Sequence, residues 1–261
     1  MAKIIAFANQ KGGVGKTTTA INIGASLAAI KRRVLLVDLD PQGNAGTGLG
    51  FVRAMHSQSV HGVIMGTSDI AGNILSTAIP NMHILPSNPQ LSSAEVELLD
   101  MENREYRLRD AIAQIAGHYD YILLDCPPAL GFLTLNALTT ADSLIIPLQC
   151  EFFALEGIQS LMSATAEIKR KWNPELDVLG IVLTMYDRRY GLTRAVESDV
   201  RGTFGGKVFQ TVIPRNVRVS EAPSHGKPAL FYDFNSSGAQ AYLRLATEIV
   251  NACNDKGETN V

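Results

Sequence analysis

The chain has 261 residues, 46% of them hydrophobic and 18% charged, and a formal net charge of −2 at pH 7. A chain of this size and composition can bury a sizeable core, so we expect one α/β domain over residues 1–261, although the length also allows two. No basic, apolar leader fits before the first predicted strand, and no run approaches the ~20 apolar residues that span a bilayer, which predicts a cytoplasmic protein without membrane contact.

The first predicted elements are an apolar strand over residues 4–8, a glycine-rich loop and a helix. Glycines let successive backbone N–H groups turn toward a polyanion, Lys16 can reach the outer phosphates, and the Thr17 hydroxyl can ligate the magnesium that bridges them. The sequence therefore predicts a phosphate cradle, made of Lys11, Gly12, Gly13, Val14, Gly15, Lys16, Thr17 and Thr18. The helix that follows has an apolar face of Ala20, Ile23, Leu27 and Ile30.

The loop departs from the usual G-x-x-x-x-G-K-S/T pattern, because Gln10 occupies the first glycine position and Lys11 adds a second lysine. A loop that already carries Lys16 has little room for another lysine from the same chain. Lys11 therefore points either to a nucleotide held by another copy of the chain or simply into solvent. The whole string resembles the deviant Walker A motif, K-G-G-x-G-K-S/T-T. That resemblance implies that Lys11 acts catalytically across a nucleotide-sandwich dimer.

A second strand is predicted over residues 34–37, and it places Asp38 and Asp40 at its carboxyl end. In an open parallel sheet, ligands bind beyond the carboxyl ends of the strands, where these carboxylates would meet the phosphates. Residues 38–44 resemble the switch I segment of the same family. The resemblance implies that Asp38 supports the hydrated magnesium and that Asp40 orients the attacking water. The alternative is a strand-ending aspartate followed by an ordinary turn.

A third strand over residues 119–124 ends in Asp125 and predicts a Walker B segment, which holds a magnesium-bound water. One strand-end acid means little by itself. Three strand-end acids behind one phosphate-binding loop form a much more specific pattern. This pattern adds Asp125 to the predicted nucleotide site. The predicted magnesium-binding residues are then Thr17, Asp38 and Asp125, with the two aspartates binding through water. Residues 127–131 resemble the switch II segment of the family.

The remaining pattern completes the fold class. Strands are predicted over residues 82–86, 143–147 and 179–183, two helices over residues 92–117, and one helix around Ile158, Leu161 and Ile168. Residues 51–81 support no prediction. Strands that alternate with helices indicate an α/β fold with a doubly wound, mostly parallel sheet and helices on both faces, as in P-loop NTPases.

Charge is unevenly distributed along the chain. Residues 187–227 contain eight cations and four acids, a net charge of +4 in a chain whose total is −2. Such a basic segment either contacts phosphate backbones or is a solvated rim. It shows no recognition-helix pattern, so a DNA contact there should be independent of sequence.

Nearly the whole chain resembles the ParA-type (Soj-like) chromosome-partitioning ATPases, most clearly over residues 184–189, 213–218 and 220–228. This resemblance implies that ATP and Mg²⁺ bind, with adenine framed by Met185, Pro214, Arg215 and Asn216. It also implies that DNA is contacted by Arg189, Arg218 and Lys227. Because the phosphate loop begins at residue 11, no N-terminal helix-turn-helix and no operator binding are expected.

The implied function is a slow ATPase. Its ATP-bound homodimer would bind double-stranded DNA nonspecifically, and a ParB-type centromere-binding protein would stimulate hydrolysis through a short basic segment. Such a protein would be cytoplasmic and associated with the nucleoid.

Three other classes are compatible with parts of the pattern. A MinD-like membrane ATPase should end in a basic amphipathic helix, but the tail over residues 249–258 is not basic. A nitrogenase-reductase-like enzyme needs cluster cysteines, whereas Cys126, Cys150 and Cys253 lie far apart without a C-x-x-C pair and are expected to be reduced and buried. A metabolic kinase or synthetase of the same fold would need an acceptor pocket, for which the sequence offers no residues.

Overall fold

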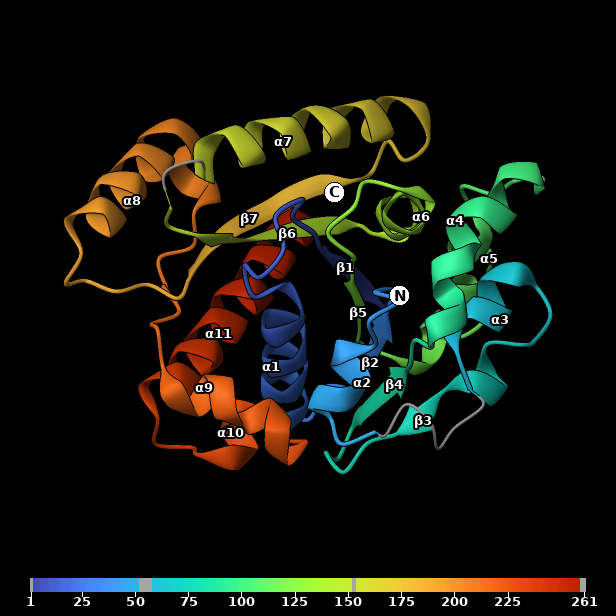
Figure 1. Cartoon of the computed structure of the whole chain (residues 1–261), viewed down its shortest axis with the longest axis horizontal. Helices are drawn as coiled ribbons and strands as arrows, with labels where there is room; N and C mark the ends of the chain where they lie inside the picture. Colours follow the sequence, from blue (N-terminus) through green and yellow to red (C-terminus); the bar gives the residue numbers. More distant parts are fainter. Residues whose placement is uncertain (1, 52–57, 152–153, 259–261) are drawn as a thin grey trace.

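The central feature of the chain is a sheet of seven strands in the order β3-β4-β2-β5-β1-β6-β7 (Figure 1). The computed structural model describes residues 2–51, 58–151 and 154–258. The strands are β1 (Lys3–Phe7), β2 (Val34–Asp38), β3 (Leu75–Ser76), β4 (Met82–Leu85), β5 (Tyr121–Asp125), β6 (Ser143–Gln149) and β7 (Asp177–Thr184). Strand β3 pairs antiparallel with β4, and the other pairs are parallel.

The parallel strands coincide with the apolar runs of the sequence. Every residue of β2 and β5 is buried, as expected for strands covered on both faces. The predicted strands are therefore confirmed, with small differences at their ends: β7, for example, begins at Asp177 rather than Leu179.

Helices cover both faces of this sheet (Figure 1). On one face lie α1 (Lys16–Ala29) and α11 (Ser237–Glu258), and on the other lie α5 (Arg107–Ala113), α6 (Phe132–Thr140) and α7 (Ala154–Lys171). Further helices are α2 (Asn44–Gly48), α3 (Val60–Met65), α4 (Ala94–Glu97), α8 (Gly191–Phe204), α9 (Val217–Glu221) and α10 (Ala229–Tyr232). The doubly wound α/β architecture predicted from the sequence is confirmed.

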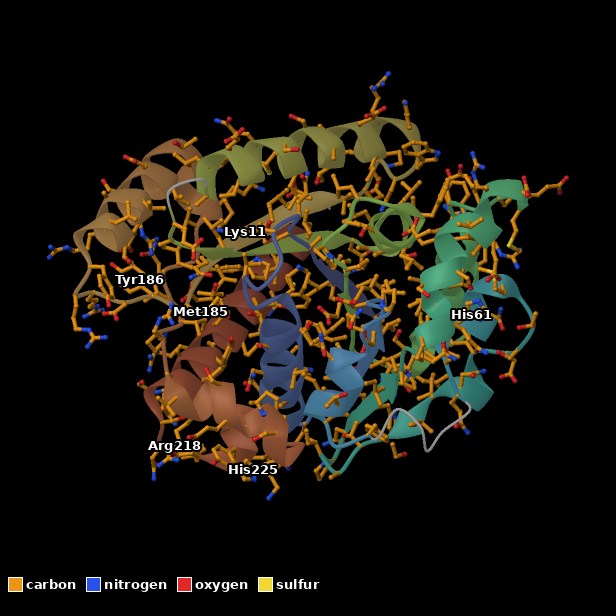
Figure 2. The ribbon with its side chains drawn as sticks, viewed as in Figure 1. Lys11, His61, Met185, Tyr186, Arg218 and His225 are labelled. Carbon is orange, nitrogen blue, oxygen red and sulfur yellow. The ribbon has the colours of Figure 1, made fainter. Side chains whose placement is uncertain are left out.

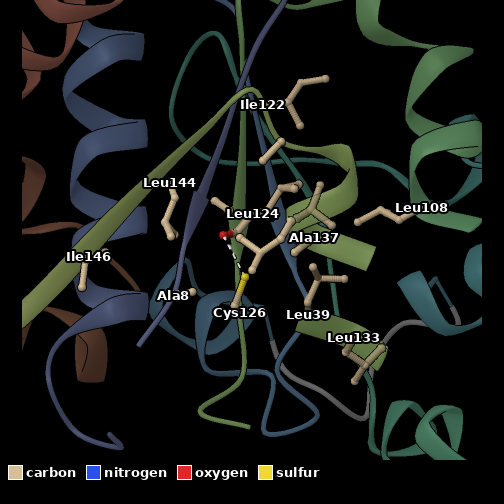
Figure 3. Close-up of a cluster of buried hydrophobic side chains, with 14 of the residues drawn as sticks. Ala8, Leu39, Leu108, Ile122, Leu124, Cys126, Leu133, Ala137, Leu144 and Ile146 are labelled. Atoms are coloured by element: carbon tan, nitrogen blue, oxygen red, sulfur yellow. Dashed lines mark hydrogen bonds between the residues drawn. The ribbon is translucent and has the colours of Figure 1, made fainter. Parts of the chain in front are cut away.

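Each face of the sheet has its own apolar layer, because side chains alternate along a strand. Ile122 and Leu124 of β5 belong to the layer beneath α5, α6 and α7, part of which is shown in Figure 3, whereas Leu123 belongs to the layer beneath α1 and α11. Cys126 lies in the first layer and is fully enclosed, and all three cysteines are buried and form no disulfide. Among the described residues, every helix is too short or too polar to cross a bilayer.

The structure corrects the sequence predictions at two places and adds elements at a third. Ile30 does not join the apolar face of α1 but is 53% exposed, because the helix ends at Ala29 and Lys31 turns the chain away with a left-handed φ of 64°. The two helices predicted over residues 92–117 are the single turn α4 between two 3-10 turns and the short α5. The segment for which no prediction was possible contributes α3 and the edge strand β3.

Candidate nucleotide-binding site

The phosphate-binding loop joins β1 to α1 at the carboxyl edge of the sheet. Gly13 and Gly15 have left-handed φ angles of 75° and 85°, which side chains with a Cβ rarely adopt. Gly15 is the N-cap of α1 and has no side chain to occupy the free N–H groups of the first turn. The loop is held from outside, since the Thr184 hydroxyl of β7 donates a 2.8 Å hydrogen bond to the Val14 carbonyl. These N–H groups are therefore available to an anion.

The two lysines of the loop point to different places. Lys16 is only 7% exposed, and its amine donates a 3.2 Å hydrogen bond to the backbone carbonyl of Lys11. Burial lowers the pKa of Lys16, and Asp125 opposes this effect. The Lys11 amine instead forms an ion pair with Glu151, just after β6, and its side chain is 48% exposed (Figure 2).

Two of the predicted carboxylates meet beneath the loop. Asp38 and Asp125 end the adjacent strands β2 and β5 and are direct neighbours in the sheet register. Asp38 accepts hydrogen bonds from the backbone N–H groups of Asp40 (3.1 Å), Ala45 (3.1 Å) and Gly46 (3.3 Å), yet burial raises its pKa to about 7. Burial, together with the nearby Asp38, also raises the pKa of Asp125 well above its usual range.

This carboxylate pair fits a hydrated magnesium ion. Both carboxylate oxygens of Asp125 are buried, and neither makes a hydrogen bond of normal geometry among the described residues, although the nearby Thr17 hydroxyl acts to lower the pKa of this carboxyl. A buried carboxylate without partners is costly unless a cation compensates it. Oxygen donors are also the ligands that Mg²⁺ prefers, usually with several waters retained. Thr17, Asp38 and Asp125 are the residues that would hold the ion.

A cavity of about 470 Å³ opens above the loop, a size suited to a small-molecule ligand. Eleven of the predicted site residues line it: Gly12, Gly13, Gly15, Lys16, Thr17, Thr18, Asp40, Met185, Pro214, Arg215 and Asn216. Four others do not. Val14 is buried in the loop, Asp38 and Asp125 lie buried at the strand ends, and Lys11 points elsewhere.

The far wall of the cavity comes from two loops that backbone hydrogen bonds join. Tyr186 N–H donates to the Ile213 carbonyl (2.9 Å), and Arg215 N–H donates to the Tyr186 carbonyl (3.0 Å). Met185, which directly precedes Tyr186, has a left-handed φ of 49°, which is uncommon for a residue other than glycine. The Asn216 side chain accepts from the N–H groups of Arg218 and Val219 and so begins α9. Met185 and residues 213–216, which are far apart in sequence, are thus brought to one wall of the cavity.

Sequence reasoning missed part of the lining: Ile21, Asn44, Thr47, Gly48, Pro128, Thr184, Ile213, Val219, Ser220, Pro223 and Tyr242. Of these residues, Tyr242 on α11 is the farthest along the chain from the phosphate loop. Its hydroxyl lies 3.5 Å from that of Thr19. Burial raises the pKa of Tyr242 to about 12. It follows no motif, so packing of α11 against α1 is what brings it to the cavity.

The basic segment is less uniformly positive than its composition suggests. Arg201 pairs with Glu197 at 2.8 Å and Lys207 with Asp177 at 3.1 Å. Among the described residues, no carboxylate lies within 4.0 Å of the cationic groups of Arg188, Arg194, Arg215 or Lys227.

Two of the three predicted DNA-contacting residues have acidic partners. Arg189 pairs with Asp187, and Arg218 lies 3.1 Å from Glu221 and 3.5 Å from Asp233. Arg218, on α9, and Lys227 are both exposed, and Figure 2 shows Arg218 at the periphery of the molecule.

The chain is similar to known proteins over most of its length. A family model described as an AAA domain matches residues 2–178. The chain is 52% identical over 256 residues to the chromosome partitioning protein ParA of Caulobacter vibrioides (strain NA1000 / CB15N), which covers 97% of this chain and 96% of that protein. It is 50% identical over 249 residues to the sporulation initiation inhibitor protein Soj of Bacillus subtilis (strain 168), covering 95% of this chain and 98% of that protein.

A solved structure shares the fold. Cobyrinic acid a,c-diamide synthase from Mycobacterium smegmatis, with bound ADP and magnesium, is 40% identical and superimposes with a TM-score of 0.84. The match covers 95% of this chain and 93% of that one.

Proposed function

This chain belongs to the ParA/Soj family of chromosome-partitioning ATPases, and from that premise we propose that it is an ATP-gated dimer that binds DNA nonspecifically and releases it on hydrolysis. The observation that carries the proposal is the buried Asp38–Asp125 pair beneath a phosphate loop that opens into a cavity of about 470 Å³. Such a pair is unfavourable by itself and favourable beside a divalent cation.

The nucleotide would lie along the cavity with its phosphates at the loop. Lys16 would exchange its bond with the Lys11 carbonyl for the outer phosphates, and the N–H groups of the first turn of α1 would hold the others. Met185, Pro214 and Asn216 would frame the base at the opposite wall. Bound magnesium supplies neutralisation of the charge that develops on the transferred phosphoryl group.

Hydrolysis needs a positioned water, and Asp40 would be the residue that orients it. Its side chain lines the cavity, and one carboxylate oxygen accepts a 2.9 Å hydrogen bond from Gln42 N–H, which fixes the direction of the group. Lys11 is not at the cavity of its own chain, so the catalytic set is incomplete in a single copy. In a sandwich dimer, Lys11 of a second copy would complete it, so the reaction would depend on assembly and would be slow in a single copy.

The DNA-binding surface would be formed by Arg189, Arg218 and Lys227, which are exposed, whereas Asp38 and Asp125 are buried. Phosphate contacts of this kind are insensitive to sequence and weaken with salt. We propose a ParB-type centromere-binding protein as the partner that stimulates hydrolysis, and nucleoid association as the consequence of DNA binding.

The decisive experiment measures DNA retention without nucleotide, with ADP, and with a nonhydrolysable ATP analogue, on two unrelated duplexes. We expect retention with the analogue alone and equal affinity for both duplexes. Retention that is independent of nucleotide, or that is confined to one duplex, contradicts the proposal.

A second candidate function is amidation of an organic acid, because the superimposed structure carries the name of a diamide synthase. ATP consumption that depends on such an acid and on an amine donor would favour it. The higher identity to ParA and Soj, over nearly the full length of all the chains, favours partitioning.

A further inference from the structure

The carboxylate of Asp187 holds the guanidinium of Arg189 by two parallel hydrogen bonds. Arg189 Nε donates to Oδ1 at 2.9 Å, and Nη2 donates to Oδ2 at 2.6 Å. The backbone N–H of Arg189 also donates to Oδ1 at 3.1 Å. This fork-to-fork geometry fixes the plane of the guanidinium as well as its position. The hydrogen bonds from Arg189 lower the pKa of Asp187 to about 2, so the carboxylate stays ionised at neutral pH.

The two partners differ sharply in exposure. The Asp187 side chain is 10% exposed, whereas that of Arg189 is 82% exposed. The carboxylate therefore lies beneath the guanidinium and does not compete for its outer edge. Nη1 of Arg189 has no hydrogen-bond partner among the described residues and remains available to an external acceptor.

Arg218 has a different environment. Its contacts with Glu221 and Asp233 are single ones, at 3.1 and 3.5 Å, and both acids are partly exposed. A guanidinium held by single contacts with partly exposed acids keeps more side-chain rotamers than one held by two parallel hydrogen bonds to a buried carboxylate. Of these two DNA-contacting candidates, Arg189 is the one that is oriented in advance.

The loop that carries the fork begins at the nucleotide cavity. Met185 lines the cavity, and the neighbouring Tyr186 is tied to the opposite loop by two backbone hydrogen bonds. Asp187 follows directly, and its carbonyl accepts a 3.2 Å hydrogen bond from Tyr190 N–H. The cavity wall and the fork are thus joined by one short, tethered segment, and its first two residues, Met185 and Tyr186, are labelled in Figure 2.

We propose that Asp187 is a positioning residue for DNA binding, which holds the Arg189 guanidinium with its free edge toward a phosphate. The inference rests on the proposed function, because it needs Arg189 to contact DNA. A carboxylate that merely competed with DNA would oppose binding, whereas a positioning carboxylate lowers the conformational cost of the contact. The two cases predict opposite signs when the charge of Asp187 is removed.

The test is the DNA affinity of Asp187→Asn with a nonhydrolysable ATP analogue, measured by fluorescence anisotropy at several salt concentrations. Immobilising a long side chain costs enough that we expect about two- to tenfold weaker binding for each arginine in contact, despite the loss of a negative charge. The salt slope should move toward that of Arg189→Ala, which lacks one phosphate contact.

Asp199→Asn is the matched control. Asp199 is an exposed acid on α8 in the same basic segment, and it forms no ion pair among the described residues. The Asp199→Asn substitution removes the same charge without disturbing an arginine. The DNA affinity of this variant should therefore be unchanged or slightly higher. The double variant Asp187→Asn/Arg189→Ala should bind like Arg189→Ala alone, because Asp187 acts only through Arg189.

Stronger or unchanged binding by Asp187→Asn overturns the inference, as does an additive effect in the double variant. Loss of analogue-induced dimerisation in Asp187→Asn also overturns it, since the residue would then support the loop rather than the arginine. Failure of the proposed function appears differently, as a parent protein that does not bind DNA with the analogue at all.

Discussion

Lys11→Ala is the variant that separates nucleotide binding from assembly. In a single copy, the Lys11 amine pairs with Glu151, and only its backbone carbonyl contacts Lys16. The substitution keeps that carbonyl and removes an exposed ion pair, whose contribution is about 0–1 kcal/mol. We therefore expect the melting temperature to fall by at most about 4 °C and ATP to bind the monomer as before.

The expected loss is in the dimer. If Lys11 contacts the nucleotide of the other copy, removing it leaves a desolvated charge unpaired, at a cost of about 2 kcal/mol or more for each of two symmetric contacts. A total of about 4 kcal/mol weakens the dimer by about a thousandfold, which places it beyond micromolar assay concentrations. Hydrolysis should be lost together with the dimer.

Light scattering with a nonhydrolysable analogue, beside a nucleotide-binding titration, measures both properties. Lys207→Ala is the matched control, because Lys207 is also a half-exposed lysine in an ion pair, with Asp177 at 3.1 Å. Dimerisation of Lys11→Ala at the concentration at which the parent protein dimerises would refute the reasoning. So would loss of ATP binding by the monomeric variant.

Three further outcomes are expected. Lys16→Ala removes the buried cation of the cradle, so nucleotide binding, dimerisation and DNA binding should all disappear in titration, scattering and anisotropy assays. Nucleotide-dependent DNA retention by this variant would show that DNA binding does not require nucleotide binding through Lys16. Asp40→Ala should keep ATP binding and trap the dimer on DNA, with steady-state turnover reduced by roughly 10²–10⁴; parent-like turnover with the partner present would remove Asp40 from catalysis. Arg218→Glu should weaken binding to every duplex and reduce the log–log salt slope by at least about one, with dimerisation intact, and an unchanged slope would exclude this arginine from the DNA contact.

The sequence alone determined the fold class and located the glycine-rich loop and the strand-end aspartates of the candidate site. Continuous apolar runs identify buried parallel strands because each residue of such a strand is covered on one face or the other. The loop before Lys16 is equally local, since Gly13 and Gly15 adopt the left-handed angles that their lack of a Cβ permits. Asp38 and Asp125 could be assigned to one edge because the carboxyl ends of parallel strands meet there.

Only the tertiary structure decided which distant residues meet. Strand β5 lies between β2 and β1, so that Asp125 is the direct neighbour of Asp38, and helix packing brings Tyr242 to the cavity. The ion pairs of Lys11 with Glu151 and of Arg189 with Asp187 depend on how their loops fold. A count of charges along the sequence cannot distinguish these paired residues from unpaired ones. Periodicity and motifs report short-range geometry, whereas orientation and pairing of side chains follow from packing over the whole chain, and no local pattern encodes them.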